Sequence, residues 1–496
     1  MSFYQRIWPA PRQIELTGGG LATPETYHFS GEYAAEFAAD MMQVHRPGIV
    51  AANGLPVIFE INPAVAVHPE GYVLKIDSDR IRLYGADPSG MYYGWQTLLQ
   101  LIAFAHKGEL WPTAVITDYP HYPKRSFMVD MGRSIYTVPM LKHMIRLLAR
   151  LKINVLHMHL FDDELCGIRF EGHDFGSDNP YAITVADLGE VVQYAKQFHV
   201  EIIPEIEGWA HVGSIVYHRP ELRGGPGVYN GSSFLFCNAT FQLMKDLITQ
   251  VAKVMPTQSI IHLGLDEANW FVKEDELPGF TPEKLVRRYY DLLKEIGREL
   301  RKEFKLMIWG DHAGRPIPQE IQDDIIVEPW CYWNSERPHM DYTLGRYGAG
   351  QPAWWAGAGE SMGQYRGAFH ATRYFAQRGS NISNLKGIDL TFWGRNDLEN
   401  HFITLFAGAG YIWNPFPPHS FADIEDYESF EKPFFPLQIR FQATFREAFP
   451  RTFREIRPVT IYNGRHWLDE EHGVALNPGV IAAGTANLHD FQNEAK

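Results

Sequence analysis

The sequence predicts an α/β fold, a (β/α)8 TIM barrel preceded by a small α+β domain and followed by a helical C-terminal tail. Three observations predict it. Eight short apolar segments between 127 and 393 alternate mostly with helical patterns. The first 120 residues instead show short strands and a single helix, and polar side chains follow nearly all eight apolar segments. We therefore expect a leading domain at 1–120, a barrel at 121–420 and a tail at 421–496.

The leading domain is predicted from strand patterns and one helical pattern. Strand-like runs lie at 56–61, 71–76 and 80–84, and apolar residues at roughly helical spacing follow at 90–102. A Pro-rich turn at 118–123 marks the end of this domain.

The barrel is predicted from its eight strands and from three clear helix starts. The strands are expected at 127–131, 153–160, 200–206, 259–263, 305–309, 325–329, 352–355 and 388–393. Thr137, Thr184 and Thr281 are expected N-caps of three of the intervening helices. The Gly-rich segment between the sixth and seventh strands shows no clear helical pattern, and the best helix of the tail is expected at 434–445.

Composition and charge exclude several functional classes. The formal net charge of −14, without a Lys/Arg run, argues against nucleic-acid binding. Three widely spaced cysteines argue against a disulfide framework or a structural zinc site. No apolar run approaches the ~18 residues of a membrane span, and the N-terminus has no apolar stretch of signal-peptide length. We expect a cytoplasmic protein without membrane partners.

Acids, imidazoles, one arginine and several indoles follow the predicted strands. In barrel enzymes, the reactive groups lie at these C-terminal strand ends. Carboxylates and arginine bind hydroxyls, and indole faces cover the C–H faces of a sugar, so the pattern predicts a polyhydroxylated ligand. The side chains are Arg133, His157, His159, Asp162, Glu205, Glu207, His211, Asp266, Glu267, Trp309, Asp311, Trp330, Tyr332, Trp354, Trp355, Trp393, Asp397 and Glu399.

The sharpest motif is the segment 262–267, which ends in Asp266 and Glu267 at the end of the fourth predicted strand. Burying two adjacent acids costs free energy, so such a pair is expected to have a functional role. Glycosidases use two carboxylates, and in one class the substrate itself carries the nucleophile, so one acid protonates the leaving oxygen while the other orients that nucleophile. The sequence shows no phosphate loop, nucleotide fingerprint or metal-ligand cluster, so no cofactor or metal is expected.

These segments make the sequence similar to glycoside hydrolase family 20, the β-N-acetylhexosaminidases. The resemblance covers roughly residues 80–415. It rests on 93–101, 118–125, 128–133 and 152–163, together with the Asp266-Glu267 pair, in this order and spacing.

The resemblance implies a retaining exo-hydrolase that removes terminal β-linked GlcNAc or GalNAc from oligosaccharides or glycoconjugates. Glu267 matches the general acid/base. Asp266 matches the residue that holds the 2-acetamido N–H and stabilises an oxazolinium-like intermediate, with the acetamide oxygen as nucleophile. Arg133 matches the clamp on the C3 and C4 hydroxyls. Asp162 and His211 match a relay that orients and tunes the acid.

The resemblance also assigns the aromatic residues of the sugar site. Trp309, Trp330 and Trp393 match indoles that surround the terminal sugar, and Tyr332 is the candidate for the hydroxyl that bonds the acetamide oxygen. Trp355 is added from its predicted place at a strand end.

The sequence departs from the family pattern in two places. Leu265 stands where many members have a second glycine. Trp393-Gly394-Arg395 stands where many members have Trp-Gly-Glu, so the carboxylate for the C4 and C6 hydroxyls is expected from Glu399 rather than Asp397.

Two alternatives remain open from the residues. A metal-dependent barrel of the amidohydrolase kind would use His157 and His159, although strands five to eight end mainly in tryptophan. A sugar-binding barrel without catalysis is the other alternative, although Asp266 and Glu267 are both present.

Overall fold

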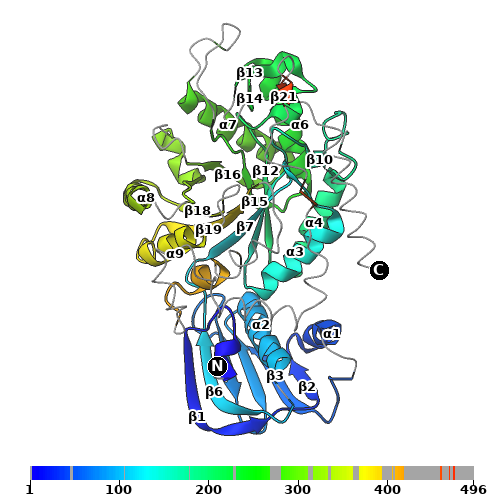
Figure 1. Ribbon diagram of the computed structural model, residues 1–496, viewed down its shortest axis with the longest axis vertical. Coiled ribbons are helices and arrows are strands. Elements are labelled where there is room, and N and C mark those ends of the chain that lie inside the picture. Colours follow the sequence, from blue (N-terminus) through cyan, green and yellow to red (C-terminus); the bar gives the residue numbers. More distant parts are fainter. Residues whose placement is uncertain are drawn as a thin grey trace, which may run out of the picture. The chain divides into compact units, whose positions relative to one another are not determined.

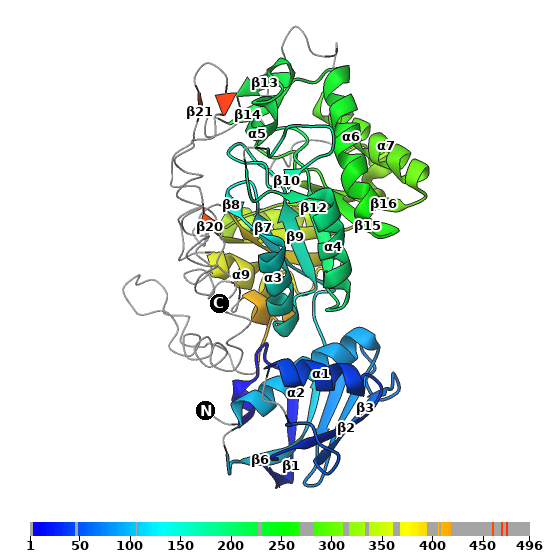
Figure 2. The same cartoon turned by 90° about the vertical axis from the view of Figure 1, so that its right-hand side faces the viewer.

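The computed structural model divides the chain into two compact units (Figures 1 and 2). Unit 1 comprises Met1–Arg125, Leu147–Ile153 and Leu405–Arg454, and unit 2 comprises Ser126–Arg146, Asn154–Thr404 and Glu455–Lys496. The structure describes residues 3–44, 48–105, 107–177, 179–226, 231–267, 277, 281–310, 317–332, 337–360, 368–393, 405, 408–417, 459–460, 468–469 and 473–474.

Unit 1 is built on a six-stranded sheet with the order β1-β6-β4-β5-β3-β2. Its strands are β1 (Gln13–Ala22), β2 (Tyr27–Gly31), β3 (Leu55–Ile61), β4 (Tyr72–Ile76), β5 (Ile81–Gly85) and β6 (Leu110–Asp118). The helices are α1 (Ala34–Val44) and α2 (Pro88–Phe104), with the short 3-10 helix η1 (Phe3–Arg6) before the sheet. Figure 2 shows α1 and α2 on the same side of the sheet. The strands predicted at 56–61, 71–76 and 80–84 and the predicted helix are confirmed.

A buried ionic cluster joins the three chain segments of unit 1. The Lys152 ammonium is fully buried and donates to the Asp118 carboxylate at 3.0 Å and to the Tyr72 hydroxyl at 2.9 Å. The indole N–H of Trp413 donates to the same carboxylate at 3.0 Å. A buried ammonium needs such a partner because burial without one costs several kcal/mol. The cluster therefore fixes the loop after α3 and the segment around Trp413 to the sheet.

Unit 2 contains a closed eight-stranded barrel, so the predicted fold is confirmed. In chain order the strands are β7 (Lys124–Asp130), β9 (Val155–His159), β12 (Glu201–Glu205), β15 (Gln258–His262), β16 (Glu303–Trp309), β17 (Ile325–Glu328), β18 (Trp354–Glu360) and β19 (Leu385–Phe392). Each strand pairs in parallel with the next one along the chain. All eight overlap the predicted segments.

The longer helices of unit 2 each lie between two consecutive barrel strands in the chain. They are α3 (Val138–Arg150), α4 (Val185–Lys196), α6 (Asn238–Val254), α7 (Pro282–Leu300), α8 (Arg337–Gly350) and α9 (Ala368–Arg378). Thr184 forms a capping box with Asp187, and Thr281 accepts the amide N–H of Lys284, so two of the three predicted N-caps are confirmed, and Thr137 stays a prediction. Helix α8 fills the segment without a clear helical pattern. It buries Met340, Thr343, Leu344 and Tyr347, but its three glycines, which disfavour helix, concealed this spacing.

Short elements complete unit 2. They are β8 (Ser134–Ile135), β10 (Ile168–Arg169), β11 (Ile183–Thr184), α5 (Gly213–Val216), η2 (Pro220–Leu222), β13 (Arg223–Pro226), β14 (Ser232–Phe234), η4 (Gln319–Asp324), β20 (Val459–Thr460), β21 (Leu468–Asp469) and β22 (Gly473–Val474). Strand β20 pairs with β8, and β21 pairs with β22. The described residues after 420 are therefore in short strands, and the helix predicted at 434–445 lies outside the described residues. Among the helices that the structure describes, none combines the length and apolar character of a membrane span.

The barrel interior changes from apolar to polar along the strands. A buried apolar cluster is formed by Val155, Ile203, Ile260, Met307, Ile326 and Trp355. Alternate residues of a strand face the same side, so the inward positions two residues further on belong to the next layer. That layer consists of His157, Glu205, His262, Trp309 and Glu328, all buried. The polar half thus lies toward the C-terminal strand ends, where barrel enzymes place their sites.

Candidate active site

The turn after β15 holds the predicted catalytic pair in a strained backbone. Leu265 and Glu267 both have positive φ, 71° and 43°, and Gly264 has a φ of 62°. A Cβ added to Gly264 would lie 1.8 Å from a carboxylate oxygen of Glu207, so a larger residue there would displace that carboxylate. A left-handed conformation costs a residue such as leucine about 1 kcal/mol, which is the physical reason why a glycine suits the position of Leu265.

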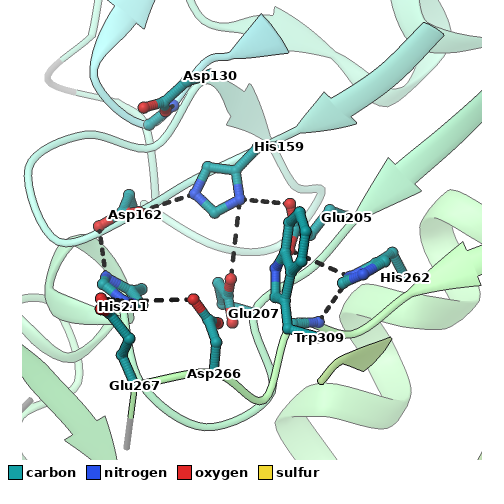
Figure 3. A network of polar contacts seen from close by, with 12 residues as sticks. Asp130, His159, Asp162, Glu205, Glu207, His211, His262, Asp266, Glu267 and Trp309 are labelled. Atoms are coloured by element: carbon teal, nitrogen blue, oxygen red, sulfur yellow. Dashed lines mark hydrogen bonds and ion pairs between the residues drawn. The ribbon is translucent and has the colours of Figure 1, made fainter. Parts of the chain in front are cut away.

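His211 connects the catalytic pair to Asp162 (Figure 3). Its Nε2 lies 3.2 Å from Glu267 Oε2 and 3.6 Å from Asp266 Oδ2, and its Nδ1 lies 3.2 Å from Asp162 Oδ1. The structure therefore brings together four residues that the sequence predicted from three different strand ends. The Glu267 side chain is 23% exposed, whereas those of His211, Asp162 and Asp266 are below 10%. Glu267 is thus the acid of this group best able to reach a ligand.

The charges of this group follow from its burial and its partners. Burial alone lowers the pKa of His211, but Asp162 and Asp266 outweigh burial and raise that pKa well above its ordinary value. Burial likewise favours a neutral Asp162, yet Arg133 and His211 hold the pKa of Asp162 well below its ordinary value. His211 is therefore an imidazolium, with Asp162 at its Nδ1 and with Asp266 and Glu267 at its Nε2.

The second-strand acid Asp163 fixes the loop that carries His211. One carboxylate oxygen of Asp163 accepts the amide N–H groups of Gly213 and Ser232, each at 2.9 Å. A Cβ on Gly231 would lie 1.9 Å from its other oxygen. Sequence reasoning gave Asp163 no role, although it directly follows Asp162.

Arg133 is buried among three carboxylates. Its terminal nitrogens lie 2.7 Å from Asp162 and 3.1 Å from Asp130, and its Nε lies 3.1 Å from Glu164. Its guanidinium carbon lies 5.7 Å from the centre of a ring of Trp393. The guanidinium thus orients Asp162, the residue that contacts His211, in addition to any ligand it binds.

The aromatic residues form a continuous set. The ring centres of Trp309 and Trp393 are 5.6 Å apart, and the Trp393 indole N–H donates to the Tyr332 hydroxyl at 3.0 Å. Tyr332 stacks on Trp330 with ring centres 5.1 Å apart. The structure does not bring Trp355 into this set, because Trp355 belongs to the buried apolar cluster near the start of β18. Glu399 lies outside the described residues.

Beneath the predicted site, Glu205 is surrounded by imidazoles. His159 Nδ1 lies 2.7 Å and His157 Nε2 lies 3.2 Å from Glu205 Oε2. The other oxygen of Glu205 accepts the indole N–H of Trp309 at 2.5 Å and lies 3.1 Å from His262 Nδ1. Further contacts join His157 Nδ1 to Asp389 at 2.7 Å and His159 Nε2 to Asp162 at 2.8 Å.

Sequence reasoning noted the strand-end histidines but missed two acids of this interior layer. Glu328 and Asp389 are buried, one on β17 and one on β19. The signal that could have found them is a single acid at an inward position of an otherwise apolar strand.

Several groups of described residues offer ligand atoms close enough to hold a metal, such as His157, Glu205 and His262. Both ring nitrogens of His159 nevertheless lie within 2.8 Å of carboxylate oxygens, and both ring nitrogens of His157 face carboxylates. An imidazole that donates from both nitrogens has no lone pair for a metal ion. The arrangement favours protonated histidines over the His157/His159 metal site of the first alternative.

We expect these two histidines to make the protein less stable in alkali. Burial lowers their pKa, but Asp389 and Glu205 around His157, and Glu205 and Asp162 around His159, raise each pKa to about 10. In the unfolded chain each pKa is about 6.5. The stabilisation is therefore complete below pH 6.5 and is lost as the pH rises through 10. Between these values the free energy of unfolding should fall by about 1.4 kcal/mol per pH unit for each histidine.

Urea unfolding at several pH values from 6 to 10 measures this slope. In the His157→Gln variant, the fall in the free energy of unfolding per pH unit should be smaller by the contribution of one histidine. His28→Gln, at an exposed position of β2, should keep the wild-type slope. Equal slopes in the wild type and His157→Gln would show that His157 is not an imidazolium.

Two family models match the chain. The model described as glycosyl hydrolase family 20, catalytic domain, matches residues 122–342, and the model described as glycosyl hydrolase family 20, domain 2, matches residues 4–119. Together these matches span well over half of the sequence, and they follow the order of the predicted leading domain and barrel. The chain belongs to glycoside hydrolase family 20. The resemblance found in the residues is confirmed.

Curated proteins similar to this chain are named beta-hexosaminidases. A beta-hexosaminidase of Porphyromonas gingivalis is 26% identical over 331 residues, which is 56% of this chain and 42% of the relative. The alpha subunit of a rat (Rattus norvegicus) beta-hexosaminidase is 26% identical over 292 residues, 53% of each chain. The chain thus spans about half the length of the curated relatives it matches.

Solved structures share the family 20 fold. An N-acetyl-beta-hexosaminidase of Streptomyces plicatus matches with a TM-score of 0.69 and 18% identity, over 91% of this chain and 96% of that one. A beta-N-acetylhexosaminidase of Bacteroides fragilis matches with a TM-score of 0.68 and 18% identity, over 89% of this chain and 95% of that one. At these identities the likeness concerns the fold.

Proposed function

We propose that this protein is a retaining exo-β-N-acetylhexosaminidase that releases terminal β-linked GlcNAc or GalNAc from oligosaccharides or glycoconjugates. One observation carries the proposal. At the C-terminal ends of the strands, a histidine joins two adjacent acids to a third, and the acid nearest solvent is Glu267. Family membership and relatives named beta-hexosaminidases support the same conclusion.

The first chemical step breaks the bond between C1 of the terminal sugar and the leaving oxygen. Glu267 gives its proton to that oxygen while the acetamide oxygen of the same sugar forms a bond to C1. His211, 3.2 Å from Glu267, stabilises the carboxylate that the proton leaves behind. Asp266 accepts the acetamide N–H and stabilises the positive charge on the ring that forms.

In the second step, water replaces the acetamide oxygen at C1. Glu267 takes a proton from this water, the oxygen of the water bonds to C1, and the bond from C1 to the acetamide oxygen breaks. Two displacements at C1 leave the anomeric configuration unchanged. Neither step uses a metal ion or a cofactor.

The aromatic set and Arg133 are proposed to bind the terminal sugar. The Trp309 and Trp393 indoles are suited to the C–H faces of the ring. The Tyr332 hydroxyl accepts the Trp393 indole N–H at 3.0 Å, and because a hydroxyl can donate as well as accept, it is the proposed donor to the acetamide oxygen. Contacts of Glu399 with the C4 and C6 hydroxyls stay a prediction, as does a cytoplasmic location.

Initial rates on aryl β-glycosides of GlcNAc, GalNAc and glucose test this function. We expect hydrolysis of one or both acetamido sugars and rates at least about 100-fold lower on the glucoside, because only the acetamido sugars carry the nucleophile. Glu267→Gln protein from a matched preparation controls for contaminating enzymes. Comparable rates on the glucoside would contradict substrate-assisted catalysis, and binding without any hydrolysis would favour the non-catalytic alternative.

A further inference from the structure

The alternation of acids and imidazoles at the site continues into the barrel (Figure 3). Every contact in this series is 3.2 Å or shorter. In order, they are Glu267–His211 (3.2 Å), His211–Asp162 (3.2 Å), Asp162–His159 (2.8 Å), His159–Glu205 (2.7 Å), Glu205–His157 (3.2 Å) and His157–Asp389 (2.7 Å). We call these seven residues the buried relay. The family resemblance implies a role only for its outer part, from Asp162 to Glu267.

We propose that Glu205, acting through the groups between them, sets the pH range in which Glu267 holds its proton. Glu205 is thus a positioning residue, because it lies in the barrel interior and contacts no reacting atom. The inference rests on the proposed function of Glu267 as the acid/base.

The contacts of His159 connect the inner part of the buried relay, from Asp389 to His159, to its outer part, from Asp162 to Glu267. His159 uses both ring nitrogens, one toward Glu205 and one toward Asp162 Oδ2. This leaves the other oxygen of Asp162 for His211 and Arg133. A change of charge at Glu205 therefore alters His159, then Asp162, and through Asp162 the imidazole that contacts Glu267.

The surroundings of Glu205 keep it ionised. Burial alone favours its neutral form, but His159 and His262 outweigh burial and hold its pKa well below the ordinary value. The remaining groups around it are His157 on β9, Glu207, Trp309 on β16, and Glu328 and Asp389 on β17 and β19. A single amide substitution at Glu205 therefore removes one negative charge from the buried relay.

Glu328 offers a matched control in the same interior layer. Burial first, and then the charge of Asp389, raise its pKa well above the ordinary value. It is therefore a neutral acid, and the change Glu328→Gln removes no charge. Glu205→Gln and Glu328→Gln are the same chemical substitution at equally buried positions, and only the first changes the charge of the relay.

The test is the pH dependence of kcat/KM on an aryl N-acetyl-β-glucosaminide. Its basic limb reports loss of the proton from the outer relay in the free enzyme. Removing a negative charge makes the surroundings more positive and favours proton loss. We expect the basic limb of the Glu205→Gln profile to move down by about 0.5–1 pH unit. This is the effect that one unit charge has on a titrating group ~10 Å away in a medium of intermediate dielectric constant. Glu328→Gln should leave it within about 0.1 unit of wild type.

Asp389→Asn is the second variant. It lies at the far end of the relay, so its shift should have the same sign and be about a third as large. If Glu205→Gln does not unfold cooperatively, Asp389→Asn decides, and the absence of a downward shift overturns the proposal. An unshifted or raised limb in folded Glu205→Gln also overturns it, as does an equal shift in Glu328→Gln.

A readout without substrate separates this inference from the proposed function. In protein with 15N-labelled histidine, the ring nitrogens of His211 report its titration by NMR. We expect a lower midpoint in Glu205→Gln than in wild type. If wild type hydrolyses no hexosaminide, the proposed function fails, and the NMR midpoints still decide whether Glu205 controls the relay.

Discussion

Replacing Glu267 with glutamine is expected to lower kcat on an N-acetyl-β-glucosaminide with a poor leaving group by about 10²–10⁴-fold. The amide cannot give a proton to the leaving oxygen, nor can it take one from water in the second step. The loss should be smaller for a dinitrophenyl leaving group, because that oxygen departs without protonation. The side chain is partly exposed, so the free energy of unfolding should change by less than about 1 kcal/mol.

Steady-state rates with both leaving groups, together with urea unfolding, check this result. Glu221→Gln is a suitable control, since the Glu221 side chain is 58% exposed and contacts Arg219 rather than a relay residue. Its rates should equal those of wild type. Wild-type rates for Glu267→Gln on the poor leaving group would remove Glu267 from the mechanism.

Replacing Arg133 with methionine is expected to lower the free energy of unfolding by about 3–5 kcal/mol at neutral pH. The substitution leaves the buried carboxylates of Asp130, Asp162 and Glu164 without the cation that they share. The loss should shrink toward pH 4, because these carboxylates can then take up protons. Activity should fall as well, because Asp162 loses the group that orients it toward His211.

Urea unfolding at pH 7 and pH 4 measures both effects. Arg287 provides the control, because it contacts Asp291 and Glu320 on the surface, where its side chain is 44% exposed. Arg287→Met should cost less than about 1 kcal/mol. Similar small costs for the two variants would mean that the buried acids around Arg133 are already neutral.

The sequence was sufficient to predict the barrel and the outer part of the site. Strand patterns and caps such as Thr184 depend on local residues, which is why all eight strands and two of the N-caps agree with the structure. Asp162, His211, Asp266 and Glu267 could be predicted to meet because the C-terminal ends of parallel strands share one edge of the barrel.

Other features depend on register and packing, which local patterns do not carry. Strand β18 begins at Trp354 and continues through alanines and glycines to Glu360, residues of low strand preference that concealed its length. Trp355 therefore lies near the start of the strand, in the apolar cluster, and not at its end. The partner of Asp389 could not be predicted either, since its contact with His157 spans 232 residues of sequence.

The anomer first released from an aryl N-acetyl-β-glucosaminide tests the central claim most directly. Proton NMR during hydrolysis distinguishes the α and β anomers of the product before they interconvert. The account predicts that β-GlcNAc appears first, because the acetamide oxygen and then water displace groups at C1 in succession. Release of the α anomer first would show a single displacement by water and contradict the role assigned to Asp266 and Glu267.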